Sequence, residues 1–490
     1  MRRTSAQLAL ALILFAVVTP PLPATCGGGG GGGMGGVGSG GIDAAEVYRV
    51  PWKVLAAGTA PETSDSGLAL YWFPVSRDEA QGSQLLDSRY LTLSFAPCGG
   101  VWLVPSDGAE LRTRYQATGG TAVAVLAGPD GSEIARAEAE KGALKLSAVE
   151  KLVKSEVDRR RSAVETKLDE AEAKQKAGEA DAATALYREI YSERCLLPGS
   201  ARKASKALKK LGVAVDEAAT FDRLPDLSPA KNDEMESLLR AGLEAEFALR
   251  LDDARRSYER ANAADPNDPV ALRFLAEYHR HHSGDWKLAK QLFEELLSHP
   301  ADAVSCAVAL HGLGKMTIHA GDFAGGVAKI EASVAAFPLP LAYRNLAVYW
   351  NSEGRVDKAQ VYVEKAMALA PDDLYNRIFA ATYLPGQDRR AEAERVAIEQ
   401  APVLEASYNL AVIWAQLGNK EKALEYLARH FYEYERFDPV RAREMREARD
   451  DIAFASLHKD AAFVELTKLA DVDFDSYHLN GSRAGGGGLR

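Results

Sequence analysis

The stretch that decides the fold runs from residue 341 to residue 373 and reads LAYRNLAVYWNSEGRVDKAQVYVEKAMALAPDD. Its apolar residues recur at helical spacing on both sides of Gly354, which predicts two amphipathic helices joined by a tight turn. Pro371 cannot continue a helix and therefore ends the second one. Large residues would fill the seam between the two helices, and small residues would allow them to cross closely: Tyr343, Leu346, Trp350 and Val363, with Ala347 and Ala359.

The same spacing recurs on both sides of this stretch. The prolines that end successive units are Pro266, Pro300, Pro338, Pro371 and Pro402, and they lie 34, 38, 33 and 31 residues apart. A divergent first unit surrounds Gly178, Ala183 and Tyr187. A near-period of this length predicts stacked helix pairs, because one pair cannot bury its apolar face alone.

This pattern resembles the tetratricopeptide repeat (TPR), W-x2-L-G-x2-Y, then A-x3-F, then P. The resemblance implies an all-α superhelix over residues 156–475, with capping helices at its ends and a concave groove lined by first-helix residues. Carried over position by position, it assigns seven residues to that groove: Arg273, Glu277, His311, Lys315, Arg344, Asn351 and Tyr408. Their mixture of positive, polar and aromatic groups predicts a protein or peptide partner.

Residues 42–155 alternate between strand and helix patterns and resemble a thioredoxin-like α/β domain. The expected strands are 68–75, 101–105, 121–127 and 133–138, and the expected helices are 77–88, 109–116 and 146–154. The family's redox cysteine pair would fall at residues 76–79 and its cis-proline at residues 119–121, and this chain has neither. A disulfide exchanger needs both an attacking and a resolving thiol, so the domain is expected to be catalytically silent.

Three further cysteines, Cys98, Cys195 and Cys306, are far apart in the sequence. The first interpretation is that they are small buried apolar residues, and one disulfide with one free thiol stays open. Cys98 follows a strand-like segment at 91–95. It carries the alternative function, a thiol-dependent redox protein that uses this single cysteine.

The start of the chain reads as an export signal. Residues 1–26 combine Arg2 and Arg3 with an apolar run of 11 residues from Leu8 to Val18, too short to span a bilayer. Residues 27–41 form a glycine-rich linker, and 476–490 a disordered tail. The order of signal, Cys26 and linker resembles a bacterial lipoprotein. Lipidation of Cys26 and ordinary cleavage near Ala24 both remain open, and either makes the protein extracytoplasmic.

Composition and the absence of motifs narrow the function. A net charge of −10 argues against a nucleic-acid binder. Nothing in the sequence favours catalysis, a metal or a cofactor. Three charged segments are expected to be solvated: the histidines at 279, 281 and 282, the basic face of Arg202, Lys203, Lys206, Lys209 and Lys210, and a terminal helix at 441–449. The sequence therefore predicts a multidomain, exported, non-enzymatic scaffold of the cell envelope.

Overall fold

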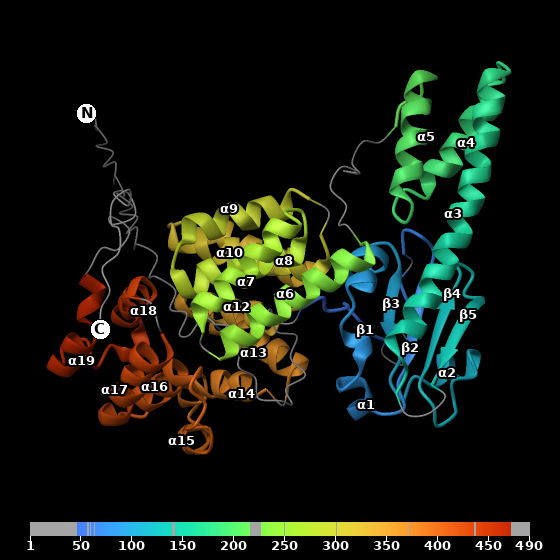
Figure 1. Ribbon diagram of the computed structural model, residues 1–490. Coiled ribbons are helices and arrows are strands. Elements are labelled where there is room, and N and C mark those ends of the chain that lie inside the picture. The colour runs from blue at the N-terminus through green and yellow to red at the C-terminus, as the bar shows by residue number, and fades with distance from the viewer. Residues whose placement is uncertain are drawn as a thin grey trace, which may run out of the picture.

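The computed structural model describes residues 47–471, apart from residues 56–57, 59, 63, 140–142, 216–226, 249, 300, 372 and 436–437. A small mixed sheet near the N-terminus is followed by many paired helices (Figure 1). The predicted signal peptide, linker and tail lie outside the described residues, as do Cys26 and Pro300. Within the described part of the chain, no helix is both long and apolar enough to cross a membrane.

The α/β domain is built on a five-stranded sheet with the order β1-β3-β2-β4-β5. β1, β3 and β2 run parallel, whereas β4 is antiparallel to β2 and β5 is antiparallel to β4. The strands are β1 (Lys53–Val54), β2 (Ala69–Phe73), β3 (Gly100–Leu103), β4 (Val123–Ala127) and β5 (Glu133–Glu138). All four predicted strands form, and β1 is too short to show a periodicity in the sequence.

Both faces of the sheet are covered, which explains the unbroken apolar run of β2. Leu70 and Trp72 lie on one face and share a core with the first part of α3 (Leu146–Lys176). Tyr71 and Phe73 lie on the other face and share a core with Tyr115, which follows α2 (Ala109–Arg114). A strand buried on both sides needs apolar residues at every position rather than at alternate ones.

Two local predictions in this domain are corrected. The expected helix at 77–88 is broken into α1 (Arg77–Gln81) and a 3₁₀ turn η1 (Gln84–Leu86), with the Ser83 hydroxyl accepting from the Leu85 amide. The strand-like segment Leu91–Phe95 forms a turn of π-helix, η2. Its alternating apolar pattern has another cause, since Leu91 and Phe95 pack into the sheet core while Leu93 packs against the helical array.

The helical array consists of consecutive antiparallel pairs. The first helices are α3, α6 (Pro229–Phe247), α8 (Pro269–Tyr278) with η3 (His279–Ser283), α10 (Ala303–His319), α12 (Pro340–Ser352), α14 (Leu374–Ala381) with η4 (Pro385–Gln387), and α16 (Ser407–Gln416). Their partners are α4 (Ala180–Ser192), α7 (Leu251–Ala264), α9 (Trp286–Leu297), α11 (Phe323–Ala336), α13 (Val356–Leu369), α15 (Arg390–Glu399) and α17 (Lys420–Arg429) with η5 (His430–Tyr434). Helix α5 (Pro198–Lys210) follows the first pair, and α18 (Asp438–Asp450), η6 (Ile452–Phe454), α19 (Ala461–Leu466) and η7 (Lys468–Asp471) close the array.

The close helix crossings that the repeat pattern implies are present. Gly354, in the turn between α12 and α13, has a φ of +70°, a conformation that glycine adopts without strain. A Cβ added at Gly314 of α10 would lie 2.5 Å from the Ile330 side chain of α11. Leu346 is fully buried in the seam. Trp350 fills its position only in part, with the Lys358 ammonium 3.7 Å above its ring.

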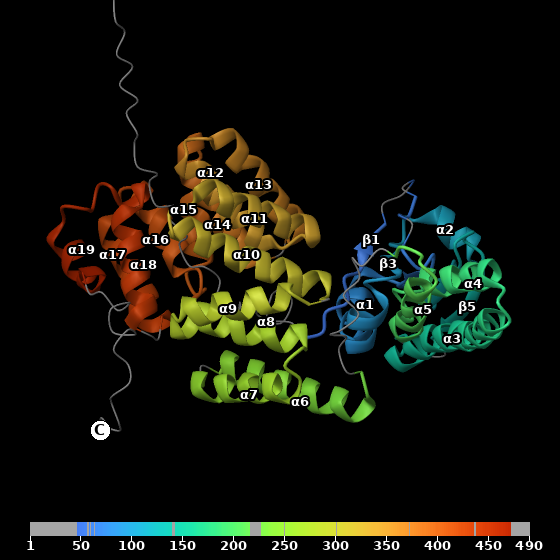
Figure 2. The ribbon, with the colours of Figure 1, turned by 90° about the horizontal axis from the view of Figure 1, so that it is seen from above.

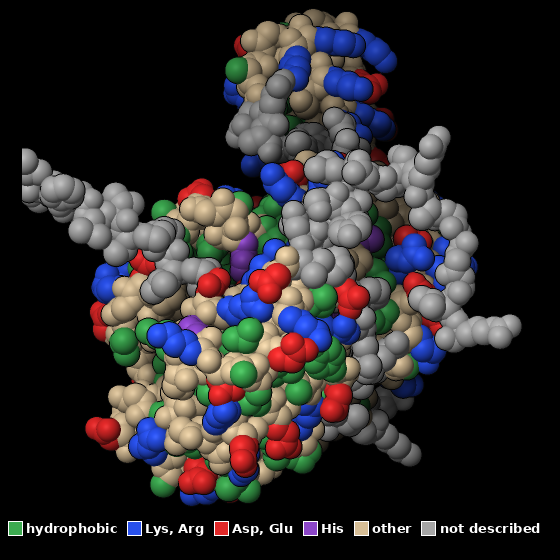
Figure 3. Space-filling view, turned by 90° about the vertical axis from the view of Figure 1, so that its left-hand side faces the viewer, with side chains coloured by type: hydrophobic (Ala, Val, Ile, Leu, Met, Phe, Trp, Pro, Cys, Tyr) green, Lys and Arg blue, Asp and Glu red, His purple; other side chains and the backbone are tan. Residues whose placement is uncertain are grey.

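Helices α3, α4 and α5 share a core with the sheet and project beyond it (Figures 1 and 2). The predicted domain boundary at residue 155 lies inside α3, which runs from Leu146 to Lys176. Lys203, Lys206, Lys209 and Lys210 are exposed on α5. Lys and Arg side chains gather on this projecting part in the space-filling view (Figure 3).

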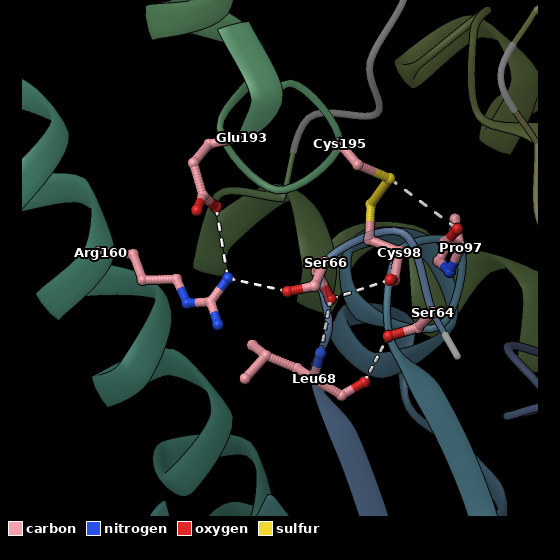
Figure 4. The surroundings of a disulfide bond; sticks show 8 residues. All are labelled: Ser64, Ser66, Leu68, Pro97, Cys98, Arg160, Glu193 and Cys195. Carbon is pink, nitrogen blue, oxygen red and sulfur yellow. Dashed lines mark hydrogen bonds and ion pairs between the residues drawn. A yellow bond between two sulfur atoms is a disulfide. The ribbon is translucent and has the colours of Figure 1, made fainter. Parts of the chain in front are cut away.

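A disulfide bond between Cys98 and Cys195 fastens the base of this projection to the sheet (Figure 4). Beside it, the Arg160 guanidinium of α3 donates to the Ser66 carbonyl at 3.0 Å and pairs with Glu193 at 3.3 Å. The interpretation of Cys98 and Cys195 as small apolar residues is therefore wrong. The open alternative is correct, because Cys306 is the free cysteine of the described residues.

A buried ion pair connects the α/β domain to the array. The Asp268 side chain is fully buried, and its Oδ1 caps α8 by accepting from the Val270 and Ala271 amides, each at 2.9 Å. Its Oδ2 accepts from the Tyr48 hydroxyl at 2.8 Å and from the Arg89 guanidinium at 2.9 Å. One carboxylate thus fixes both the start of a repeat and the position of the neighbouring domain.

Candidate functional site: the concave groove of the array

A cavity of about 780 Å³ opens on the first-helix side of the last three helix pairs. Helices α12, α14 and α16 form its walls, and residues 450–456, which follow α18, form one side. Apolar side chains such as Val348, Phe379 and Val412 lie among polar ones. Recognition sites for peptide segments commonly combine apolar walls with a few placed polar groups.

Two of the seven predicted groove residues line this cavity, Asn351 and Tyr408. Asn351, on α12, is exposed to solvent. Tyr408, on α16, is buried, and its hydroxyl donates to Asp451 at 3.1 Å. The phenol is therefore engaged within the chain, whereas the Asn351 amide is available to a ligand.

Asn409 also lines the cavity, and the groove assignment missed it. Its side chain is 5% exposed, and among the described residues its Nδ2 has no hydrogen-bond partner. A buried amide donor without a partner is unfavourable by about 1–3 kcal/mol, so such a group points to a ligand or a water. The sequence did contain a signal, since Asn409 directly precedes Leu410-Ala411, the pair that matches Leu-Gly in the repeat pattern.

Two other predicted groove residues hold the array together. Arg273 of α8 is 1% exposed, and it donates to the Ser305 hydroxyl at 3.4 Å and to the Val47 carbonyl at 3.3 Å. Arg344 of α12 donates to the Asn376 side chain of α14 and lies 4.5 Å from the centre of the Tyr375 ring. Both guanidinium groups connect neighbouring elements.

The remaining three, Glu277, His311 and Lys315, lie on α8 and α10 in a mostly buried polar cluster. Burial alone would raise the pKa of Glu277, but Arg280 at 2.8 Å and His281 at 3.2 Å hold that pKa well below its ordinary value. Burial lowers the pKa of His311 well below its ordinary value, and its Nε2 lies 2.6 Å from the Asn345 amide. The imidazole is therefore neutral at pH 7.

The histidine segment after α8 is not a solvated turn. It forms the π-helical turn η3, in which His279 is 8% exposed and the side chains of His281 and His282 are largely buried. His282 lies 3.0 Å from Glu246 of α6. The prediction failed because the residues that bury and pair this segment come from other helices.

The charge-dense segment 441–449 is also buried rather than solvated. On α18, Ala442, Met445 and Ala448 are fully buried, and Glu444 and Glu447 are 6% and 4% exposed. The Arg443 guanidinium lies 3.7 Å from the centre of the Trp286 ring, and Glu447 lies 3.5 Å from His319 at the end of α10. Helix α18 therefore covers the ends of the first helices α8 and α10, beside which it lies in Figures 1 and 2. The open part of the groove is the part formed by α12, α14 and α16.

The thiol-dependent alternative is not compatible with the bonding of Cys98. A single-cysteine mechanism needs a free thiolate at this position, and Cys98 is bonded to Cys195. Cys306 retains its thiol, but burial raises the pKa of that thiol to about 11. It is protonated at neutral pH and is a poor nucleophile.

No protein-family model matches the chain, and no curated protein matches its sequence. Among solved structures, the chain is similar to PilW, described as a widely conserved type IV pilus biogenesis factor. The two share 16% sequence identity over 57% of this chain and 96% of PilW, with a TM-score of 0.27. A similarity at this level leaves the function to be argued from the geometry of the chain itself.

Proposed function

We propose that this protein is a non-enzymatic TPR scaffold that binds a polypeptide partner in the concave groove formed by α12, α14 and α16. The unpartnered amide of Asn409 in a cavity of about 780 Å³ carries the proposal. A carbonyl oxygen of the partner would accept from Nδ2, and the apolar walls would hold its side chains. Asn351 would supply a second amide at the cavity mouth.

The geometry of the helix pairs supports the repeat assignment. Turn glycines with positive φ recur at equivalent places, at Gly284, Gly321, Gly354 and Gly418. A Cβ at Gly242, where the pattern has its Leu-Gly glycine, would lie 2.3 Å from the ring of Tyr258. Only glycine allows that approach without displacing the aromatic residue.

The α/β domain is proposed to be a thioredoxin-like domain without redox chemistry. Its sheet order, with three parallel strands followed by two antiparallel ones, supports this assignment. Its Cys98–Cys195 disulfide joins residues 97 positions apart and ties α4 to the sheet, which is a structural role. A disulfide is also typical of proteins outside the reducing cytosol, and so it supports the proposed export of the chain. Lipidation of Cys26 remains a proposal.

Site-specific photocrosslinking tests the groove. A photoreactive phenylalanine analogue placed at Asn351 or at Val412 should give one and the same crosslinked polypeptide in cells that express the chain. A matched position on the opposite side of the same helix pair is Glu364, which is exposed on α13. Crosslinking from that position should give no such product.

Asn409→Ala then tests the chemistry. It removes the amide donor, so the yield of the same crosslink should fall several-fold, while Gln360→Ala, an exposed change on α13, should leave the yield unchanged. Equal crosslinking from the inner and outer positions would refute a groove-directed partner.

A further inference from the structure

A second and larger cavity, of about 1350 Å³, lies between the α/β domain and the array. One side is formed by β1, β3 and the loops that follow them. The other is formed by the chain before α10 and α12 and by the end of α13, with Ala301, Phe337 and Leu369. Figures 1 and 2 both place β1 at the edge of the sheet that is nearest to the array. We call this space the interdomain cleft.

The cleft contains an open strand edge. β1 is the terminal strand of the sheet, and its pairing with β3 places Val54 opposite Leu103. The Leu55 amide donates to the Leu103 carbonyl at 2.9 Å. Because backbone groups alternate along a parallel pair, the amide and carbonyl of Val54 point away from β3. Its side chain is 67% exposed, so the strand edge here is accessible.

An indole in the same cleft has an unused donor. Trp102 of β3 is 5% exposed, and its Nε1 has no hydrogen-bond partner among the described residues. This nitrogen lies against Gly100, where a Cβ would come within 2.5 Å of it. Both residues line the cleft. A buried Trp N–H normally has an acceptor, so this one points to a missing acceptor group in the cleft.

Apolar surface accompanies these two features. Leu369 at the end of α13 is 38% exposed and lines the cleft together with Phe337 and Val54. The cationic and anionic groups of Lys53 and Glu62, also in the lining, pair with each other at 2.8 Å. That pairing gives no preference for a charged ligand. What the cleft offers is a strand edge, one hydrogen-bond donor and apolar walls.

We propose that the interdomain cleft binds an extended, uncharged apolar peptide segment that adds to the sheet at β1. One residue of the segment pairs its carbonyl and amide with the amide and carbonyl of Val54. A further backbone carbonyl accepts from Trp102 Nε1, and apolar side chains contact Phe337 and Leu369. This mode gives affinity through the main chain and selectivity through the walls. The site is separate from the groove of α12, α14 and α16.

The test uses a library of 12-residue peptides displayed on phage and selected on the full-length protein. Binding of each enriched peptide is then measured by fluorescence anisotropy on four variants. Trp102→Phe keeps an aromatic ring but removes the donor, and Val54→Pro removes the outward amide without breaking a bond to β3. Each should weaken binding about five-fold or more, as expected for the loss of one hydrogen bond with its partner left unpaired. Val54→Ala, which keeps the amide, and Asn409→Ala, in the other groove, should not weaken it.

The outcomes separate clearly. Enrichment of apolar peptides that lose affinity on Val54→Pro and Trp102→Phe but not on Asn409→Ala supports the proposal. Peptides that bind all variants equally, or no enrichment at all, would overturn it. A dimer in light scattering that Val54→Pro converts to a monomer would also overturn it, because a second copy of the chain would then occupy the edge. If Trp102→Phe unfolds the domain, as its near-ultraviolet circular dichroism would show, the Val54 pair decides alone.

Discussion

Replacing Arg89 by Met should destabilise the contact between the α/β domain and the array far more than the removal of any surface charge. Arg89 is fully buried, and its guanidinium contacts the equally buried carboxylate of Asp268 at 2.9 and 3.2 Å. Removal of one partner leaves a buried charge, which typically costs about 3–5 kcal/mol. Asp268 would keep the Tyr48 hydroxyl and two backbone amides as donors, so the lower end, about 3 kcal/mol, is expected.

The same interface contains a matched control. Arg240 of α6 pairs with Asp87 of the α/β domain at 3.2 Å, but the two side chains are 46% and 30% exposed. Exposed ion pairs contribute about 0–1 kcal/mol because water and salt screen them. Arg240→Met should therefore change stability by less than 1 kcal/mol, although it removes the same type of residue from the same boundary.

Urea unfolding followed by far-ultraviolet circular dichroism gives the stability of each variant, and hydrogen exchange at Val270 and Ala271 reports the start of α8. Arg89→Met should shift the first transition and speed exchange at these two amides, whereas Arg240→Met should do neither. The double variant Arg89→Met, Asp268→Asn should recover part of the loss, since no buried charge remains. Equal shifts for the two arginine variants would refute the reasoning that burial sets the energy of this contact.

Three further changes test other parts of the structure. Leu346→Asp should lower the melting temperature markedly, because an unpaired charge in a fully buried seam costs several kcal/mol; an unchanged melting curve would contradict the repeat register. Cys98→Ser should lower the stability of the α/β domain by about 2–4 kcal/mol, and dithiothreitol should affect the wild type but not the variant, as urea titrations would show. Burial lowers the pKa of His281 to about 4 and that of His319 to about 3. The unfolded chain therefore binds protons that the folded chain does not as the pH falls below about 6.5, so the urea midpoint should fall between pH 6.5 and 5, and a flat profile would contradict the burial of these rings.

The sequence was most informative where a feature depends on its own neighbours in the chain. The helix pair around Gly354 follows from apolar spacing, a glycine in the turn and a proline at the end. The four longer strands of the α/β domain follow from short apolar runs between turn residues. These signals extend over about ten residues, and the structure needs no distant partner to satisfy them.

The predictions failed where a partner lies far along the chain. The charged residues of α18 suggested a solvated helix, yet Arg443 packs on Trp286, more than 150 residues earlier. The histidines of η3 suggested a solvated turn, yet His282 pairs with Glu246 of another helix. Cys98 meets Cys195 for a similar reason, since spacing alone cannot select one pairing of three cysteines.

The groove assignment shows why residue type and position within a repeat do not suffice to locate a binding site. Arg273 and Asn409 both lie on first helices, but Arg273 donates to the Val47 carbonyl of the α/β domain, whereas the Asn409 amide reaches a cavity and no partner among the described residues. What separates them is the surroundings of the array: the α/β domain engages α8, α18 covers the ends of α8 and α10, and neither closes the space between α12, α14 and α16. The repeat pattern specifies a continuous inner surface, and these flanking elements decide which part of that surface a partner can reach. Changes in α18, and not only changes in the groove itself, should therefore alter which partners this scaffold can bind.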